Sequence, residues 1–222
     1  MNYSFRNKKV AVNRWKKIHD SEKEKFCQDC SEKYALLGFL AGDGGVQIRK
    51  AKNDYYQIDF FPDDKFMLKI YLNFLLEVYN KDSSVINHGT FYSVRLTSKT
   101  VVLDMIKYGD LDTKKWRVPC KCYNNLTFAL YWLKAFFSCE AYVTEKVIRI
   151  QTVNKEGMQD IKKLLDCFDI SSNVYSYVPK NPNHSEVFII VIQKKSSRFK
   201  FREKIGFWHS KKSEMLDKAL SL

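Results

Sequence analysis

Two acidic residues stand out because each one follows an apolar segment. Asp43 comes directly after residues 34–42 (YALLGFLAG), and Glu140 closes a mainly apolar segment that begins at residue 126. Such segments predict buried helices, so each carboxylate would lie at a helix C-terminus. The partial negative charge of the helix dipole disfavours an anion there. We therefore expect a cation to bind near Asp43 and Glu140.

The alternative is that both acids are ordinary surface groups, one in the polar turn 42–45 (GDGG) and one at a solvated helix end. An internal repeat argues against it. Glu140 lies 97 residues after Asp43 (140 minus 43), and the same step relates other identical or similar residues. These pairs are Leu36/Leu133, Gly38/Ala135, Phe39/Phe136, Gly109/Gly206, Lys114/Lys211 and Lys115/Lys212. Several such pairs at the same separation favour an internal duplication.

The hydrophobic pattern predicts the same order of elements in both halves. In the first half we expect helices over 34–42, 66–78 and 99–108, and strands over 46–50, 55–61, 84–87 and 91–97. The second half repeats this order with helices over 126–137, 155–168 and 196–204, and strands within 143–152, 174–178 and 187–193. Each half is therefore helix–strands–helix–strands–helix, an α+β pattern.

The duplication also divides the chain. We expect a basic N-terminal arm over residues 1–30, a first repeat over 31–118, a linker over 119–125 and a second repeat over 126–222. The two apolar helices can pack side by side because their contact positions are small: Gly38, Gly42, Ala135 and Cys139. That packing would bring Asp43 and Glu140 together.

The charge of the chain indicates its partner. Lys and Arg number 38 against 25 Asp and Glu, which gives a net charge of +13. Such an excess favours a polyanion, and nucleic acid is the natural candidate. The alternative is a basic but otherwise ordinary protein. Hydrophobic residues make up 45% of the chain, enough for a packed core.

No apolar stretch approaches the roughly 18 residues that span a bilayer, and residues 1–20 are polar. We expect a protein with no membrane partner, located inside the cell in the cytoplasm or nucleoid, or in an organelle.

The cysteines and histidines offer weaker signals. Cys27/Cys30 and Cys120/Cys122 could supply four thiolates to zinc, but the second spacing is poor, so reduced thiols or local disulfides are favoured. The four histidines lack ligand spacing, which disfavours a histidine-based nuclease site. The sequence contains no P-loop or dinucleotide fingerprint.

Residues 36–44 (LLGFLAGDG) resemble the LAGLIDADG motif of homing endonucleases, and residues 133–141 (LKAFFSCEA) resemble a degenerate second copy. Residues 148–158 and 204–207 also resemble segments that follow the motif. The resemblance covers about residues 34–218 and is nearest to the single-chain, two-motif type, such as members encoded in archaeal introns. The second copy departs from the pattern at Ala135 and Ala141, where glycine is usual.

The resemblance implies an α+β fold of two pseudo-twofold related αββαββα repeats, with saddle-shaped antiparallel sheets packed through the motif helices. It implies a monomer that cuts both strands of DNA at a long asymmetric site. Asp43 and Glu140 would bind Mg²⁺, with Mn²⁺ as a substitute, helped by the carbonyls of Gly42 and Cys139. Two carboxylates suffice for metal-assisted attack of water on phosphate.

Other site residues follow from charge and strand alternation. Charge that develops on the phosphate needs cations, for which Lys115 and Lys212 are candidates beside Lys114 and Lys211; the alternative is that they only contact backbone phosphates. Alternation in the strands directs a second set toward the DNA groove: Gln47, Arg49, Tyr55, Gln57, Asp59, Arg95, Arg149 and Gln151.

The sequence thus predicts a site-specific, Mg²⁺-dependent double-strand DNA endonuclease. The alternative is an RNA maturase or a non-cleaving nucleic-acid-binding protein on the same scaffold. Acids in both motifs favour the enzyme, because a binding module needs neither.

Overall fold

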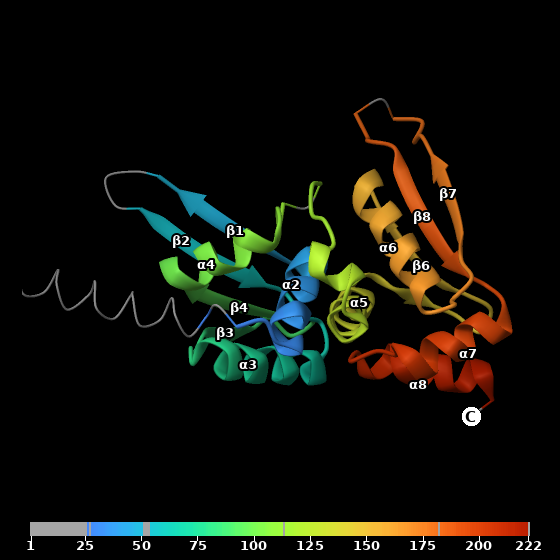
Figure 1. The fold of residues 1–222 in the computed structure, drawn as a ribbon, viewed down its shortest axis with the longest axis horizontal. Coiled ribbons are helices and arrows are strands. Elements are labelled where there is room, and N and C mark those ends of the chain that lie inside the picture. Colours follow the sequence, from blue (N-terminus) through green and yellow to red (C-terminus); the bar gives the residue numbers. More distant parts are fainter. Residues whose placement is uncertain (1–25, 27, 51–53, 113, 182, 222) are drawn as a thin grey trace, which may run out of the picture.

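A computed structural model describes residues 26, 28–50, 54–112, 114–181 and 183–221. Two four-stranded antiparallel sheets flank a central pair of helices, α2 (Ser31–Asp43) and α5 (Leu126–Glu140) (Figure 1). Most of the expected N-terminal arm, including Cys27, lies outside the described residues.

Both repeats have the same topology. The first sheet has the order β1-β2-β4-β3 and the second the order β5-β6-β8-β7. The first repeat continues from α2 with β1 (Gly44–Arg49), β2 (Tyr55–Phe60), α3 (Lys65–Tyr79), β3 (Ser84–Asn87), β4 (Tyr92–Thr97), α4 (Lys99–Met105) and η1 (Ile106–Tyr108). The α+β class and the two equivalent repeats are confirmed.

A short 3₁₀ helix, η2 (Cys120–Tyr123), leads into the second repeat. After α5 come β5 (Tyr142–Val143), β6 (Ile148–Thr152), α6 (Lys155–Cys167), β7 (Asn173–Tyr177), β8 (Val187–Ile192), α7 (Lys195–Lys204) and α8 (Ser210–Leu220). The prediction that a helix near 196–204 closes the repeat was wrong, because α8 follows it. The last helix expected in the first repeat, over 99–108, is split into α4 and η1.

The two central helices approach each other closely because their contact positions are small. A methyl group added at Gly38 would lie 2.4 Å from the Trp132 carbonyl oxygen and 2.9 Å from the Ala135 Cβ. One added at Gly42 would lie 2.5 Å from the Cys139 Cβ. These distances are shorter than van der Waals contact, so the backbones meet at both glycines. The helix ends are thereby held next to each other.

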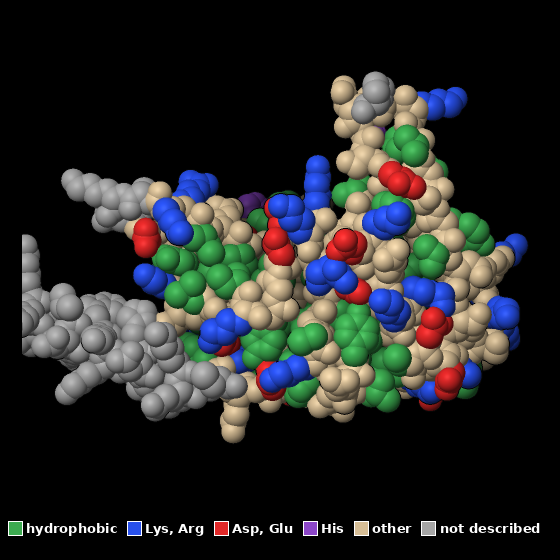
Figure 2. Space-filling model, turned by 45° about the horizontal axis from the view of Figure 1, so that its top comes forward, with side chains coloured by type: hydrophobic (Ala, Val, Ile, Leu, Met, Phe, Trp, Pro, Cys, Tyr) green, Lys and Arg blue, Asp and Glu red, His purple; other side chains and the backbone are tan. Residues whose placement is uncertain are grey.

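Within the described ranges, no helix is long and apolar enough to cross a membrane. On the face that Figure 2 shows, Lys and Arg side chains lie on both halves of the molecule.

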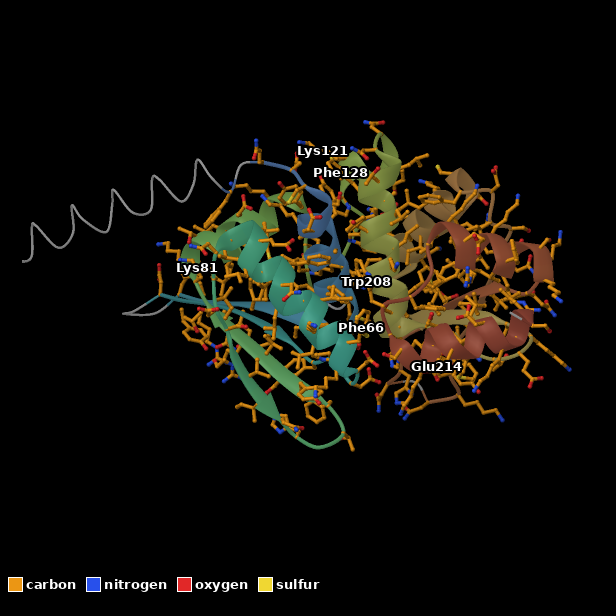
Figure 3. All side chains as sticks on the ribbon, turned by 90° about the horizontal axis from the view of Figure 1, so that it is seen from below. Phe66, Lys81, Lys121, Phe128, Trp208 and Glu214 are labelled. Atoms are coloured by element: carbon orange, nitrogen blue, oxygen red, sulfur yellow. The ribbon has the colours of Figure 1, made fainter. Side chains whose placement is uncertain are left out.

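Trp208, between α7 and α8, ties the second repeat to the first. Figure 3 shows this side chain between α3 and α5. Its ring lies 5.4 Å from that of Phe39 on α2 and 5.5 Å from that of Phe74 on α3. Aromatic pairs at these distances add to the stability that burial gives. The segment after Trp208 is therefore placed against the C-terminal ends of α2 and α5.

Candidate functional site

The structure brings Asp43 and Glu140 together at the adjacent ends of α2 and α5. A Cβ built on Gly42 would lie 3.7 Å from the Glu140 Cγ. Burial, and then repulsion from the Asp43 carboxylate, raises the pKa of Glu140 to about 7. The pKa of Asp43 is raised as well, chiefly by burial. Two half-buried acids that repel each other in this way would be stabilised by a shared cation.

The ammonium group of Lys212, on α8, lies beside the two acids. Its Nζ donates hydrogen bonds to the carbonyl oxygens of Ser138 (2.7 Å) and Cys139 (2.6 Å) in the last turn of α5. The positive charge opposes the effect of burial on the pKa of both Asp43 and Glu140. The carbonyl of Cys139, which the resemblance assigns to a metal, therefore already accepts one hydrogen bond.

Lys115, the repeat-related partner of Lys212, occupies a different environment. Its side chain is exposed, and its backbone N–H donates to the Asp112 carbonyl in a turn (2.9 Å). No hydrogen bond or ion pair joins its side chain to either acid within the part of the chain that the structure describes. Lys114 and Lys211 are also exposed. The structure thus places one lysine of the predicted catalytic pair at the acids and the other at the surface.

Two further residues near the acids were missed by the sequence reasoning. His209 lies with its Nε2 3.4 Å from Asp63 Oδ1 and its Nδ1 3.8 Å from Asp64 Oδ2. Asp63 raises and His209 lowers the pKa of Asp43, so both act on the site electrostatically. The available signal was the acidic pair that follows the strand over residues 55–61. His209 gave no signal, because its position depends on how the chain turns after α7.

The donor set at the acids fits a hard divalent cation. Among the described residues, no salt bridge neutralises Asp43 or Glu140, and no group of three His, Cys, Asp or Glu side chains could hold a metal by itself. Mg²⁺ prefers oxygen ligands, keeps several waters and commonly uses one or two carboxylates together with substrate phosphates. Asp43 and Glu140 match that requirement.

Each sheet has a buried face, packed on helices, and an opposite face that we call the open face. In the first sheet the open face carries Gln47, Arg49, Tyr55, Gln57, Asp59, Arg95 and Thr97; in the second it carries Tyr142, Arg149, Gln151, Tyr175, Val187, Ile189 and Val191. All eight strand residues predicted to face DNA lie on these two faces.

The expectation that Gln57 and Asp59 are exposed was wrong, since only 2% and 4% of their surfaces are accessible. Both lie on the central strand β2, where long side chains from the neighbouring strands cover them. The Asp59 carboxylate accepts hydrogen bonds from Gln47 Nε2 (3.2 Å) and Arg95 Nε (2.9 Å). The Arg95 side chain remains 57% exposed, so Asp59 orients it rather than burying it.

On the second sheet, Arg149 donates a hydrogen bond to the side-chain oxygen of Gln151. Gln151 is exposed and Arg149 is half-buried. Arg149 therefore has a fixed neighbour on its own strand but no carboxylate partner among the described residues.

Comparison with known proteins agrees with this geometry. Residues 127–206 match the family model of the LAGLIDADG-like domain. The fold is similar to that of I-DmoI in complex with DNA and Mn, with a TM-score of 0.63 and 20% identity over 79% of this chain and 96% of that chain. It is also similar to the homing endonuclease I-WcaI bound to its DNA recognition sequence, with a TM-score of 0.56 and 18% identity over 90% of this chain and 91% of that one.

A curated relative is the replication factor C small subunit of Methanocaldococcus jannaschii, 27% identical over 185 residues and 81% of this chain. The chain spans about a tenth of the length of that protein (10%). Fold and site together define a two-repeat protein of the LAGLIDADG architecture, as the sequence resemblance predicted.

Proposed function

We propose that this protein is a site-specific DNA endonuclease that cuts both strands with a divalent metal, Mg²⁺ or Mn²⁺. The observation that supports the proposal is the meeting of Asp43 and Glu140. These acids come from different repeats and repel each other at a half-buried site, and no salt bridge to either acid is present among the residues that the structure describes. A protein that only binds nucleic acid gains nothing from such an arrangement, because a buried acid pair weakens both the fold and the attraction to phosphate.

In this proposal Asp43 and Glu140 hold the metal, and the backbone carbonyls of Gly42 and Cys139 are further candidate ligands. A divalent metal bound there would activate water and stabilise the departing 3′ oxygen. Two carbonyl hydrogen bonds hold the ammonium group of Lys212 next to the acids. That charge favours the ionised carboxylates, which are the forms that bind a metal.

The partner is double-stranded DNA with a long asymmetric site. Each open face would contact one half-site, and the two faces differ in their side chains. One chain supplies both acids and both sheets, so a monomer is sufficient. The net charge of +13 favours binding to the phosphate backbone. Such a substrate places the protein in a compartment that holds DNA.

The test is cleavage of a supercoiled plasmid library that carries randomised inserts, incubated with Mg²⁺ or Mn²⁺ and with EDTA as the control. We expect linear product from a subset of inserts and none with EDTA. Sequence-specific binding of DNA or RNA without cutting in either metal would support the maturase or binding-protein alternative. Binding without any sequence preference would leave only a basic structural protein.

A further inference from the structure

The open face of the second sheet has an apolar centre. On β8, side chains alternate between the two faces, and Ile190 and Ile192 are fully buried against the helices. The alternate positions are also apolar and only partly exposed: Val187, Ile189 and Val191. The hydrophobic core lies on the other face, so these three side chains are not needed to fill it.

The apolar side chains are continuous with the polar ones that would contact DNA bases. Val191 pairs with Arg149 on β6 and with Asn173 on β7, while Ile189 pairs with Gln151 and Tyr175. Tyr175 is 53% exposed. Ile189 and Val191 therefore lie between hydrogen-bonding side chains in the middle of the open face, at the position that would face the floor of a bound groove.

The chemistry of the major groove limits what such side chains can recognise. Ile and Val offer no hydrogen-bond donor or acceptor. Thymine, through its C5 position, is the base that presents a methyl group on the major-groove edge of the base pairs. A polar base edge pressed against Ile189 or Val191 would lose its water without gaining a partner, which is unfavourable.

We propose that the second repeat recognises thymines in its half-site through contact of their C5 methyl groups with Ile189 and Val191. This inference rests on the proposed function, because it takes the open face to be the DNA-binding face. The positions of the first sheet that correspond to Ile189 and Val191 are Ser93 and Arg95, which are polar, so these positions should not require a thymine methyl group.

The experiment replaces thymine by deoxyuridine, which removes only the methyl group and leaves base pairing unchanged. A target is first selected from randomised DNA, with binding and cleavage scored separately. Each thymine of the target is then replaced singly. We expect about fourfold weaker binding at one or two positions in a single half-site, the effect of exposing one buried methyl group. Deoxyuridine in the other half-site should change the Kd less than twofold.

A double-mutant cycle assigns the contact to particular side chains. Val191→Ala and Ile189→Ala should each weaken binding of the thymine target, and each should abolish the deoxyuridine effect at one position, because the two losses remove the same contact. The matched control is Ser93→Ala, at the first-sheet position that corresponds to Ile189. It should leave the deoxyuridine effect intact.

The outcomes separate the two proposals. Specific binding or cleavage without any deoxyuridine effect overturns the inference and leaves the proposed function standing, as does an effect that persists in both alanine variants. If the wild-type protein selects no sequence in either assay, the proposed function falls and the inference falls with it. The wild-type deoxyuridine scan does not depend on how any variant folds.

Discussion

The two sheets have the same topology but different open faces. Across the first sheet, one row of paired residues is Gly45–Asp59–Arg95–Ser84; across the second, the equivalent row is Tyr142–Arg149–Val191–Asn173. Where the first sheet has an arginine oriented by a carboxylate, the second has a valine beside Arg149, which is hydrogen-bonded to the Gln151 amide instead. The next row contrasts Ser93 with Ile189. Residues on the open faces are outside the core, so they could diverge while the fold was retained.

The ends of the central helices show a second difference between the repeats. Both repeats keep an acid there, Asp43 and Glu140, but Lys212 of the second repeat alone places a cation at the pair, since Lys115 lies at the surface. The acids are equivalent by position, and their surroundings are not.

The largest effect should come from the acids. Asp43→Asn and Glu140→Gln each remove a proposed metal ligand while keeping the side-chain shape. We expect each to reduce the rate of linear product at least about 100-fold, the scale on which loss of one electrostatic group affects catalysis. The rates of nicking and of linearisation should be measured separately on the selected plasmid. If one variant still nicks one strand at the wild-type rate, each acid serves a single strand.

Stability measurements distinguish this loss from misfolding. Burial raises the pKa of both acids, and repulsion from Asp43 raises that of Glu140 further, so the amide variants should be at least as stable as the metal-free wild type in urea unfolding. Asp82→Asn, at an exposed aspartate, is the matched control and should cut normally. A large drop in stability for either amide variant would contradict the account of the site.

Substitutions of the two repeat-related lysines test whether only Lys212 supports the acids. Lys212→Met removes charge-assisted hydrogen bonds to two carbonyls, each bond of this kind contributing about 1.5–3 kcal/mol. We expect cleavage to fall about 10- to 100-fold, with a smaller loss for Lys115→Met. Single-turnover rates at saturating protein would separate this effect from weaker DNA binding. Equal losses for the two variants would show that the repeat-related pair acts symmetrically, as the sequence predicted.

The difference between the two open faces can be tested at Arg95. Asp59 holds Arg95 with its guanidinium exposed, which suits the bidentate contact of arginine with guanine. Arg95→Ala should weaken binding about tenfold and relax specificity at one base pair, more than the effect expected for Val191→Ala. Both effects are measured as the Kd for targets that carry each of the four base pairs in turn at every position. Arg95→Lys, which retains the charge, should lose the discrimination but keep the phosphate attraction. Full discrimination in Arg95→Lys would remove Arg95 from base recognition.

The sequence predicted the repeated order of elements and the meeting of Asp43 with Glu140. Both depend on the local hydrophobic pattern and on small residues that occupy equivalent positions in the two motif helices. It did not predict α8, whose place follows from Trp208 packing against α2 and α3. Strand alternation assigned Gln57 to the open face correctly. It could not show that side chains from neighbouring strands bury that residue, because coverage depends on the register of the whole sheet.

The smallest expected effect is the pH dependence of metal binding. The folded protein raises the pKa of Glu140 to about 7, from an ordinary value of 4.5. Protonated Glu140 is therefore favoured in the metal-free fold, and its contribution to stability is fully present below pH 4.5 and is lost as the pH rises through 7. The metal binds the carboxylate form, so metal affinity should increase with pH over the same interval.

At a concentration of about ten times the Kd, Mg²⁺ would add about 1.4 kcal/mol to the free energy of unfolding, which is a rise in Tm of a few degrees. We expect this rise at pH 8 and little of it at pH 6 in thermal unfolding. Glu140→Gln should lose the dependence on pH, whereas Glu145→Gln, at an exposed glutamate, should keep it. An equal rise in Tm at both pH values would mean that the metal does not displace a proton from Glu140, and that the acid from the second repeat is not a ligand.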